Sequence, residues 1–368
     1  MTSATLLSLL RLKFTSGLGD ILIQRLVKHF HTPEAIFLAS TRDQLSVQGI
    51  SKSIIKELGN SNYLTQAEEE LARIKKQQIK VLSWLDGEYP FRLKQCVDKP
   101  SLLFYKGTIT PYPKRIISIV GTRKISHYGR AFLKTLIPQL APHQPLVVSG
   151  LAYGTDALAH QLALDYQLPT YGILAHGLNR IYPGEHASMA KQILEDDGAL
   201  MTDFTFHTKP DRENFPKRNR IIAGLSDLTL VVESDIKGGS MISARLANDY
   251  NREVMALPGN INQKNSNGCN LLIKQNLAHM ITSAEDLIKL LDWQESTPKT
   301  TKQTNMFPTL NTEEKQIVAL FHQNGQLSVD QISLALQKPG NQISVQLLAL
   351  EMKGVVVALP GSQYKLMQ

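Results

Sequence analysis

The chain has 368 residues, of which 42% are hydrophobic and 20% are charged, and this balance excludes an intrinsically disordered chain. Its formal net charge of +8 mildly favours a polyanionic partner. The two cysteines, Cys96 and Cys269, form no CxxC motif, so we expect a reducing compartment, no disulfide framework and no zinc site.

The first residues predict no targeting segment. The apolar stretch at 4–10 is short, lacks a preceding basic segment and is interrupted by Arg11 and Lys13, which argues against a signal peptide. No apolar run approaches the length needed to cross a membrane. We therefore expect a cytoplasmic protein that does not contact membranes.

Sequence patterns divide the chain into four parts. Residues 1–85 contain periodic helical patterns with little strand signal, which predicts a helical domain. Residues 86–293 form a second domain, in which short apolar runs alternate with amphipathic runs from about residue 113. Residues 294–309 are polar and contain prolines, as expected for a linker, and residues 310–368 form a small terminal domain.

The middle domain is predicted to be an α/β domain with a mostly parallel sheet covered by helices on both sides, because strand and helix patterns alternate. In such sheets a ligand lies beyond the carboxyl ends of the strands. The predicted strands are 115–120, 146–148, 170–174, 228–232 and 254–257, and the predicted helices are 127–140, 155–166, 186–196, 219–225 and 240–251.

A basic segment with one aromatic ring, residues 212–222, is the main candidate for a binding site. It carries Arg212, Lys217, Arg218 and Arg220, and Phe215 is expected to be extended because a proline follows it. Cations beside a ring suit a phosphate backbone and a stacked base. Phe215 could instead be buried in the core, with the neighbouring charged side chains on a solvent-exposed face. Arg218 and Arg220 are two residues apart and cannot both point the same way on a helix, so one could form a structural or dimer salt bridge.

Three other features could contribute to the same site. Arg123 follows the first predicted strand of the parallel sheet, where a guanidinium can clamp a phosphate; the alternative is a surface ion pair. Ser240 follows two glycines at a helix start, where backbone amides can bind a phosphate; the alternative is a plain helix cap. Ser149 and Gly150 follow the second strand, where the backbone can approach a ligand, although a tight turn alone would also explain the glycine.

No pattern indicates catalysis or a cofactor. The turn at Ser149 matches neither GxGxxG nor a P-loop, and the histidines do not follow a metal-ligand pattern such as HExxH. No nucleophile elbow or catalytic carboxylate pair is recognisable. This favours a binding protein without metal or cofactor over an enzyme.

The middle domain closely resembles the bacterial DNA-processing protein A family, also called Smf. The family's motifs occur in order over roughly 170 residues. The matching segments are Ile119-Val-Gly-Thr-Arg-Lys124, Ser149-Gly-Leu-Ala152, Ile181-Tyr-Pro183, Asn214-Phe-Pro216, Arg218-Asn-Arg-Ile-Ile-Ala-Gly-Leu-Ser226, Gly239-Ser240, Ser243-Ala-Arg-Leu-Ala247, Leu257-Pro-Gly259 and Gly268-Cys-Asn270. The chain departs from the family at Tyr153, where arginine is common, and at Ala175-His176, which replaces a frequent glycine-cysteine.

The resemblance implies an extended Rossmann-like domain that binds single-stranded DNA and forms a homodimer. It also implies a recombination mediator that protects incoming DNA and loads the RecA recombinase during natural transformation, without catalytic activity. The phosphate pocket implied by the family motifs comprises Arg123, Arg212, Arg218, Arg220 and Ser240, with Phe215 as the ring beside the strand.

The flanking parts fit family members with extra domains. Glycine turns near residues 17–19 and 49 resemble those of a SAM-like or helix–hairpin–helix module, and the tail predicts three helices and a β-wing, a winged helix. The third helix of the tail, at 342–353, is electrostatically poor for DNA, so a protein contact is at least as plausible as groove binding.

Two other functions are open from the sequence. One is a nucleotide phosphoribohydrolase of the lysine-decarboxylase-like Rossmann group, which expects a PGGxGTxxE pattern. Here Lys237 and two glycines open the helix, and no glutamate follows in its first turn. The other is a transcription regulator, which rests on the winged helix alone.

Overall fold

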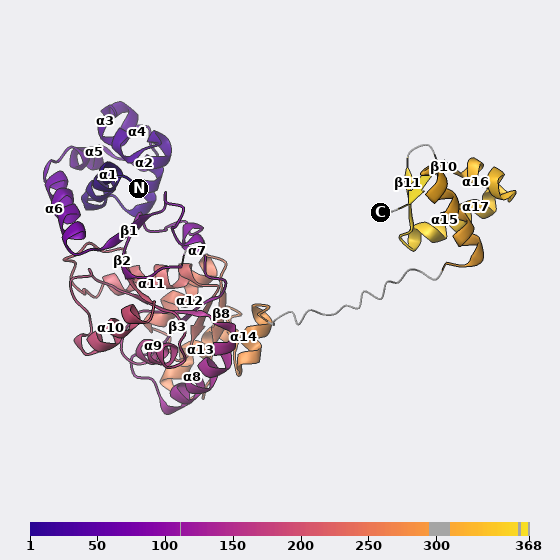
Figure 1. The fold of residues 1–368 in the computed structure, drawn as a ribbon. Helices are drawn as coiled ribbons and strands as arrows, with labels where there is room; N and C mark the ends of the chain where they lie inside the picture. Colours follow the sequence, from indigo (N-terminus) through magenta and orange to yellow (C-terminus); the bar gives the residue numbers. More distant parts are fainter. Residues whose placement is uncertain (111, 294–309, 360–361, 367–368) are drawn as a thin grey trace. The chain divides into compact units, whose positions relative to one another are not determined.

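The computed structural model describes residues 1–110, 112–293, 310–359 and 362–366, and the predicted linker at 294–309 lies outside the described residues. The chain divides into two compact units, Met1–Trp293 and Gln294–Gln368. The first unit contains the N-terminal helices as well as the large sheet (Figure 1).

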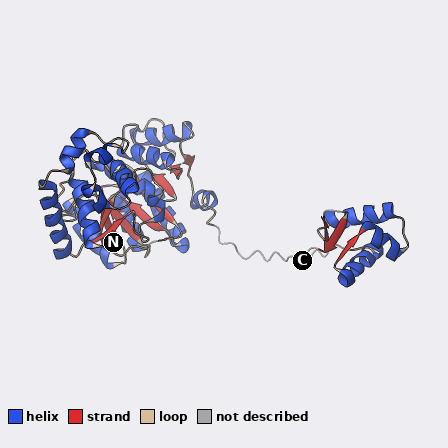
Figure 2. Cartoon of the chain, turned by 90° about the horizontal axis from the view of Figure 1, so that it is seen from above, coloured by secondary structure: helices blue, strands red, loops and turns tan. Residues whose placement is uncertain are grey.

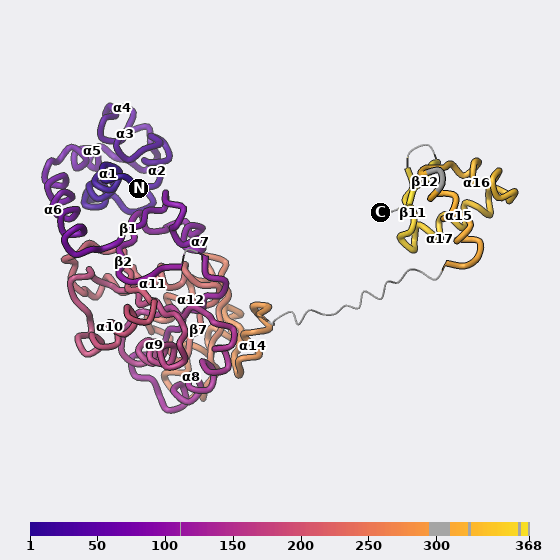
Figure 3. Tube along the Cα trace, viewed as in Figure 1, coloured from indigo at the N-terminus to yellow at the C-terminus, as the bar shows by residue number. Residues whose placement is uncertain are grey.

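The first unit begins with helices that stop and restart at capping residues. Their bounds are α1 Ser3–Phe14, α2 Asp20–Phe30, α3 Pro33–Leu38, α4 Thr41–Leu45, α5 Lys52–Leu58 and α6 Asn62–Lys76. The side chains of Thr2, Thr32, Ser40 and Ser51 each accept a backbone N–H at a helix start, which satisfies one of the amides left free there. Figure 3 shows the chain leaving α6 to enter the sheet at β1.

Among the described residues, nine strands form one sheet in the order β1-β2-β6-β5-β4-β3-β7-β8-β9. The strands β3 to β9 pair in parallel, and β1 and β2 add antiparallel pairs at one edge. Their bounds are β1 Lys80–Ser83, β2 Leu102–Gly107, β3 Ile116–Val120, β4 Leu146–Ser149, β5 Thr170–Ile173, β6 Ala199–Thr202, β7 Leu228–Val231, β8 Glu253–Ala256 and β9 His279–Met280.

Helices cover both faces of this sheet, as predicted (Figure 2). On one face, α8 (His127–Leu140), α9 (Thr155–Asp165) and α14 (Ala284–Leu290) pack against a cluster that includes Ile117 and Ile119. On the other, α11 (Asn214–Leu225), α12 (Gly239–Asp249) and α13 (Lys264–Lys274) pack with Ile116 and Val120. The short helix α10 (Ala187–Glu195) lies against α9 and β6.

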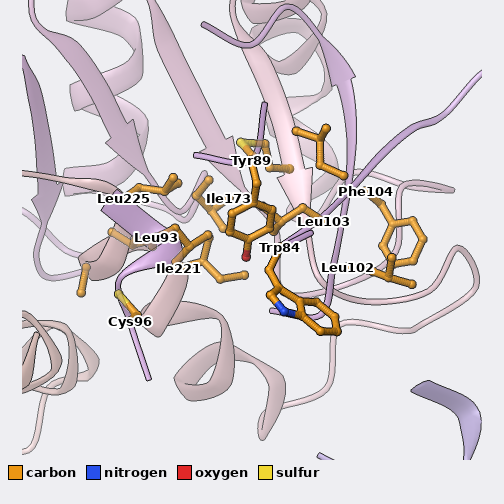
Figure 4. Close-up of a cluster of buried hydrophobic side chains, with 14 of the residues drawn as sticks. Trp84, Tyr89, Leu93, Cys96, Leu102, Leu103, Phe104, Ile173, Ile221 and Leu225 are labelled. Carbon is orange, nitrogen blue, oxygen red and sulfur yellow. The ribbon is translucent and has the colours of Figure 1, made fainter. Parts of the chain in front are cut away.

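The cluster on the α11 face continues into the N-terminal helices. Leu93 of α7 (Phe91–Lys94) and Tyr89 belong to the same cluster as Ile173 of β5 and Ile221 of α11 (Figure 4). Leu9 and Leu26 from the N-terminal helices also belong to it. Strand β1 lies within residues 1–85 but pairs with β2, so the sheet begins before the predicted boundary.

Helix α11 starts five residues earlier than its predicted start at 219. It begins at Asn214, and Phe215 is therefore helical rather than extended, which corrects the prediction made from Pro216. Pro216 occupies the third position of the helix, where the backbone N–H has no intrahelical acceptor, so its missing hydrogen costs no helical bond.

The second unit has the elements predicted for a winged helix. Helices α15 (Thr312–Asn324), α16 (Val329–Leu336) and α17 (Gly340–Met352) enclose a core with Ile317, Phe321 and Leu347. Strands β11 (Val356–Leu359) and β12 (Gln363–Leu366) pair as a wing, and the unpredicted β10 (Gln326–Ser328) pairs with β12.

Candidate nucleic-acid interface

A cavity of about 290 Å³ opens at the carboxyl ends of β3 and β7. From β3 the chain builds β4, β5 and β6 on one side, and then returns to place β7 on the other side. Such a reversal of strand order leaves a crevice between the loops that leave the two strands. The lining residues are Val120, Gly121, Thr122, Arg123, Ala152, Asp156, Phe215, Arg218, Asn219, Ile222, Ser234, Asp235, Gly238, Gly239, Ser240, Ser243 and Asn265.

The first turn of α12 forms one wall of the cavity. Its N-cap, Gly238, provides no side-chain acceptor, so the amides of this turn keep the partial positive charge of a helix start. A methyl group added at Gly239 would meet no protein atom within 4 Å. The Ser243 hydroxyl is buried and has no hydrogen-bond partner among the described residues. This wall therefore offers open space and the amides of a helix start to an anion.

The floor of the cavity is formed by Arg218, which is only 3% exposed. Its Nη1 donates to the Gly150 carbonyl at 2.7 Å and also to the Ile173 carbonyl. Burial lowers the pKa of Arg218 to about 10, although nearby Asp156 opposes the shift, so the guanidinium stays charged at neutral pH. Asp156 is itself buried, and burial raises its pKa. The Nε of Arg218 has no hydrogen-bond partner among the described residues.

Arg123 and Phe215 form the open side of the cavity. The Arg123 guanidinium lies 5.3 Å from the centre of the Phe215 ring, and that of Arg218 lies 5.9 Å from it. Arg123 is exposed and has no ion pair with a described residue. Asp235, also on the lining, forms an ion pair with Lys264 at 3.5 Å. The positive charge at the opening is therefore concentrated on the Arg123 side.

Comparison with known proteins identifies the family of this fold. Residues 80–292 match a model of the DNA recombination-mediator protein A family, and residues 302–362 match a model of its winged helix domain. The chain is 34% identical to Protein Smf of Escherichia coli over 324 residues, which cover 82% of this chain and 84% of that protein.

The chain belongs to the DNA recombination-mediator protein A family.

Other relatives and solved structures agree with this assignment. Protein Smf of Synechocystis is 32% identical and covers 95% of this chain and 96% of its own. DNA processing protein A from Streptococcus pneumoniae has a TM-score of 0.61 at 29% identity, covering 76% of this chain and 95% of that one. The protein from Helicobacter pylori, described for its single-stranded DNA binding mode, has a TM-score of 0.52 at 29% identity, covering 58% and 95% of the two chains.

In this member of the family the cavity lies inside the matched residues 80–292 and brings together four of the predicted site residues, Arg123, Phe215, Arg218 and Ser240. Neither Arg212 nor Lys217 lines it. Both are exposed at the start of α11, where they can approach a ligand only from outside.

Three residues predicted to contact DNA do not line the cavity. Ser149 is fully buried and its hydroxyl donates to the Ile119 carbonyl at 2.6 Å, so it lies beneath the surface. Gly150 is buried too, and a methyl group there would collide with the Arg218 guanidinium; it lines a smaller adjoining pocket instead of the cavity. Arg220 does not line the cavity, because it forms ion pairs with Asp20 and Asp203.

Sequence reasoning missed several lining residues. Asn219 donates to the Gly239 carbonyl at 3.2 Å and so ties α11 to the start of α12. Asp156 accepts the Gly150 amide at 3.1 Å, and Asn265 reaches the rim from the start of α13. Asn219 falls within a segment that carries the family resemblance, but its neighbours in sequence do not reveal a role at the cavity.

Among the described residues, no helix combines the length and apolarity needed to cross a membrane. Within the same residues, no group of three or more His, Cys, Asp and Glu side chains converges on a point where a metal could bind. Cys96 and Cys269 are buried free thiols.

Proposed function

We propose that this chain is a single-stranded DNA-binding recombination mediator that protects incoming strands and loads a RecA-type recombinase onto them during natural transformation. We further propose that it acts in the cytoplasm, as a homodimer, without catalysing a reaction. The observation that carries the proposal is the cavity, which combines the first turn of α12, the free guanidinium of Arg123 and the ring of Phe215.

The chemistry of the cavity suits a phosphate. Amides at a helix start and an arginine without a carboxylate partner stabilise a phosphate oxygen. These donors contact backbone oxygens and carry no sequence information, so binding should be independent of sequence. The H. pylori relative is described for single-stranded DNA binding, which supports the same ligand here.

The winged helix is a weak source of phosphate affinity. Two of its cations, Lys338 and Lys353, are already paired with Glu313 and Glu314 at 2.6 Å. An internally paired cation releases little counterion from DNA, so the first unit should supply most of the binding energy. The winged helix is then free to modulate binding or to contact a protein.

Dimer formation would help the chain to hold a long DNA strand. Two linked sites hold one strand more tightly than one site, because the second engagement is intramolecular. A symmetric dimer requires one self-complementary patch on the first unit. Sedimentation of the full chain at micromolar concentration should show a dimer, and a strict monomer there would remove this part of the proposal.

The deciding experiment measures the affinity of the full chain for single-stranded and duplex oligonucleotides over a range of salt concentrations. We expect tighter binding to single strands and a steep loss of affinity with salt. Arg123→Ala should reduce the salt slope by about 0.7, the value for one phosphate contact on a single strand. Arg245→Ala, which removes an exposed arginine of α12 outside the cavity, is the control.

Equal or tighter binding to duplex would reject the proposed strand preference. An unchanged affinity and salt slope in folded Arg123→Ala would show that the phosphate site lies elsewhere. Recombinase loading needs its own assay, in which the chain should accelerate recombinase assembly on strands that are already covered by a single-strand binding protein.

A further inference from the structure

A second, smaller pocket adjoins the cavity and shares Arg123, Ala152 and Phe215 with it. Its volume is only about 10 Å³, too small to enclose a nucleobase. Its rim carries two further aromatic side chains, Tyr153 and Tyr182. A base next to this pocket must therefore lie on the exposed rings rather than inside a pocket.

Both tyrosines are exposed, Tyr153 at 40% and Tyr182 at 43%. The Tyr182 ring contacts Phe215 edge-on, with centroids 6.1 Å apart and an interplanar angle of 62°. That geometry leaves no room for a base between the two rings, so a base would stack on the outer face of Tyr182.

The Tyr153 ring is held in place at both ends. Its hydroxyl donates to Glu185 at 2.8 Å, and its ring packs edge-on against His186 at 5.2 Å. His186 is itself fixed, because its Nδ1 donates to the Leu151 carbonyl at 2.8 Å. An exposed ring that is already ordered loses little entropy when a base stacks on it.

We propose that Tyr153 and Tyr182 form a stacking surface for the bases that follow the phosphate held at Arg123. This inference rests on the proposed function, since it assigns the path of the same strand as it leaves the cavity. The proposal is supported by the continuity of the two pockets, because Arg123 and Phe215 line both of them. Every base presents a flat face, so this surface adds affinity without reading sequence.

The stacking surface predicts that bases themselves contribute to affinity. The test compares an oligothymidylate with an abasic oligonucleotide of the same length, which keeps the phosphates but has no rings to stack. We expect the full chain to bind the base-bearing strand about tenfold more tightly, the scale of one base stacked on an aromatic side chain.

Tyr153→Leu combined with Tyr182→Leu should remove this preference and leave the salt slope unchanged, because no phosphate contact is lost. Tyr153→Phe keeps the ring and should keep the preference. Tyr166→Leu is the matched control: Tyr166 is 42% exposed but follows the end of α9, towards the amino ends of the parallel strands, whereas the cavity lies at their carboxyl ends. Fluorescence of the two buried tryptophans reports whether each variant is folded.

Equal binding of the two oligonucleotides by the unaltered chain would overturn the stacking surface while leaving phosphate binding intact. A folded double variant that keeps the preference would also overturn it. A chain that binds neither strand would reject the proposed function, and the stacking surface with it.

Discussion

Replacing Arg220 with methionine removes a cation that joins distant parts of the first unit. The Nη2 of Arg220 donates to Asp20 at 2.7 Å and to Asp203 at 2.5 Å, and Nη1 donates to the Asp98 carbonyl. The side chains of Arg220, Asp20 and Asp203 are only 14%, 13% and 7% exposed. Methionine keeps an apolar stem of similar length, so the change isolates the charge and its hydrogen bonds.

The expected loss of stability can be estimated in two ways. Removing one partner of a buried ion pair typically costs about 3–5 kcal/mol, because the remaining charge is left uncompensated. Burial raises the pKa of Asp20, but Lys13, Arg220 and Ser101 together lower it from 3.8 to about 2. That shift alone corresponds to about 2 kcal/mol at neutral pH. Because Asp203 loses its partner as well, we expect a loss of about 3–5 kcal/mol for Arg220→Met.

Urea unfolding followed by tryptophan fluorescence measures this loss in the full chain. The chain has two tryptophans, Trp84 and Trp293, and both are buried in the first unit. Adding Asp20→Asn and Asp203→Asn to Arg220→Met should restore much of the stability, since no unpaired charge remains buried. The exposed Arg245→Met should change the free energy of unfolding by less than about 0.5 kcal/mol.

The opposite result is equally informative. If Arg220→Met keeps its stability but its affinity for single strands falls and its salt slope drops by about 0.7, Arg220 is a phosphate contact, as the sequence predicted. The structural assignment of Arg220 would then be wrong.

Three further predictions concern the cavity, the tail and pH. Gly239→Ala should leave the free energy of unfolding unchanged or raise it by up to about 1 kcal/mol. It should nevertheless weaken single-strand binding by at least about tenfold, because the added methyl group enters the cavity. Gly340→Ala, at the first residue of α17, is the control for both measurements, because its methyl group would meet only the Val329 side chain at 3.9 Å, an ordinary contact distance. Deleting residues 301–368 should change single-strand affinity by no more than a few-fold in a filter-binding assay, since the deleted part pairs cations internally. The lowered pKa of Asp20 stabilises the fold above pH 4, and about 2 kcal/mol of this stability should disappear between about pH 5 and 2 in acid unfolding, a component that Asp20→Asn should lack.

The strands that the sequence predicted correctly are those buried on both faces. All five residues of β3 are buried, as are the four of β4, and a continuous apolar run is a strong signal for such strands. The sequence missed two interior strands, β2 and β6, although β6 is buried at every residue. The two edge strands that it missed, β1 and β9, gave weaker signals. In β9 both residues, His279 and Met280, are exposed, and β1 begins with the exposed Lys80. These edge strands depend on a neighbouring strand for their conformation, which a local pattern does not show.

The kinds of chemical group at the candidate site could be predicted from the sequence, but the position of each side chain could not. The sequence located Arg218 and Arg220 together and showed that they must point in different directions. Which one faces the cavity depends on Asp20, which lies 200 residues away along the chain. The burial of Ser149 could not be predicted for the same reason: its place at a strand end is local information, whereas its bond to Ile119 of the neighbouring strand is not.

Helix α11 connects the candidate DNA site to the N-terminal helices. Phe215 and Arg218 line the cavity, while Arg220 on the same helix holds Asp20 at the start of α2. The loop before α11 is held as well, because Glu70 of α6 accepts the Phe206 amide at 2.7 Å. Removing the N-terminal helices would therefore leave Arg220 and Asp203 with fewer partners and release this loop. A truncated chain that loses DNA binding would report the displacement of α11, and it would not show that the N-terminal helices touch DNA.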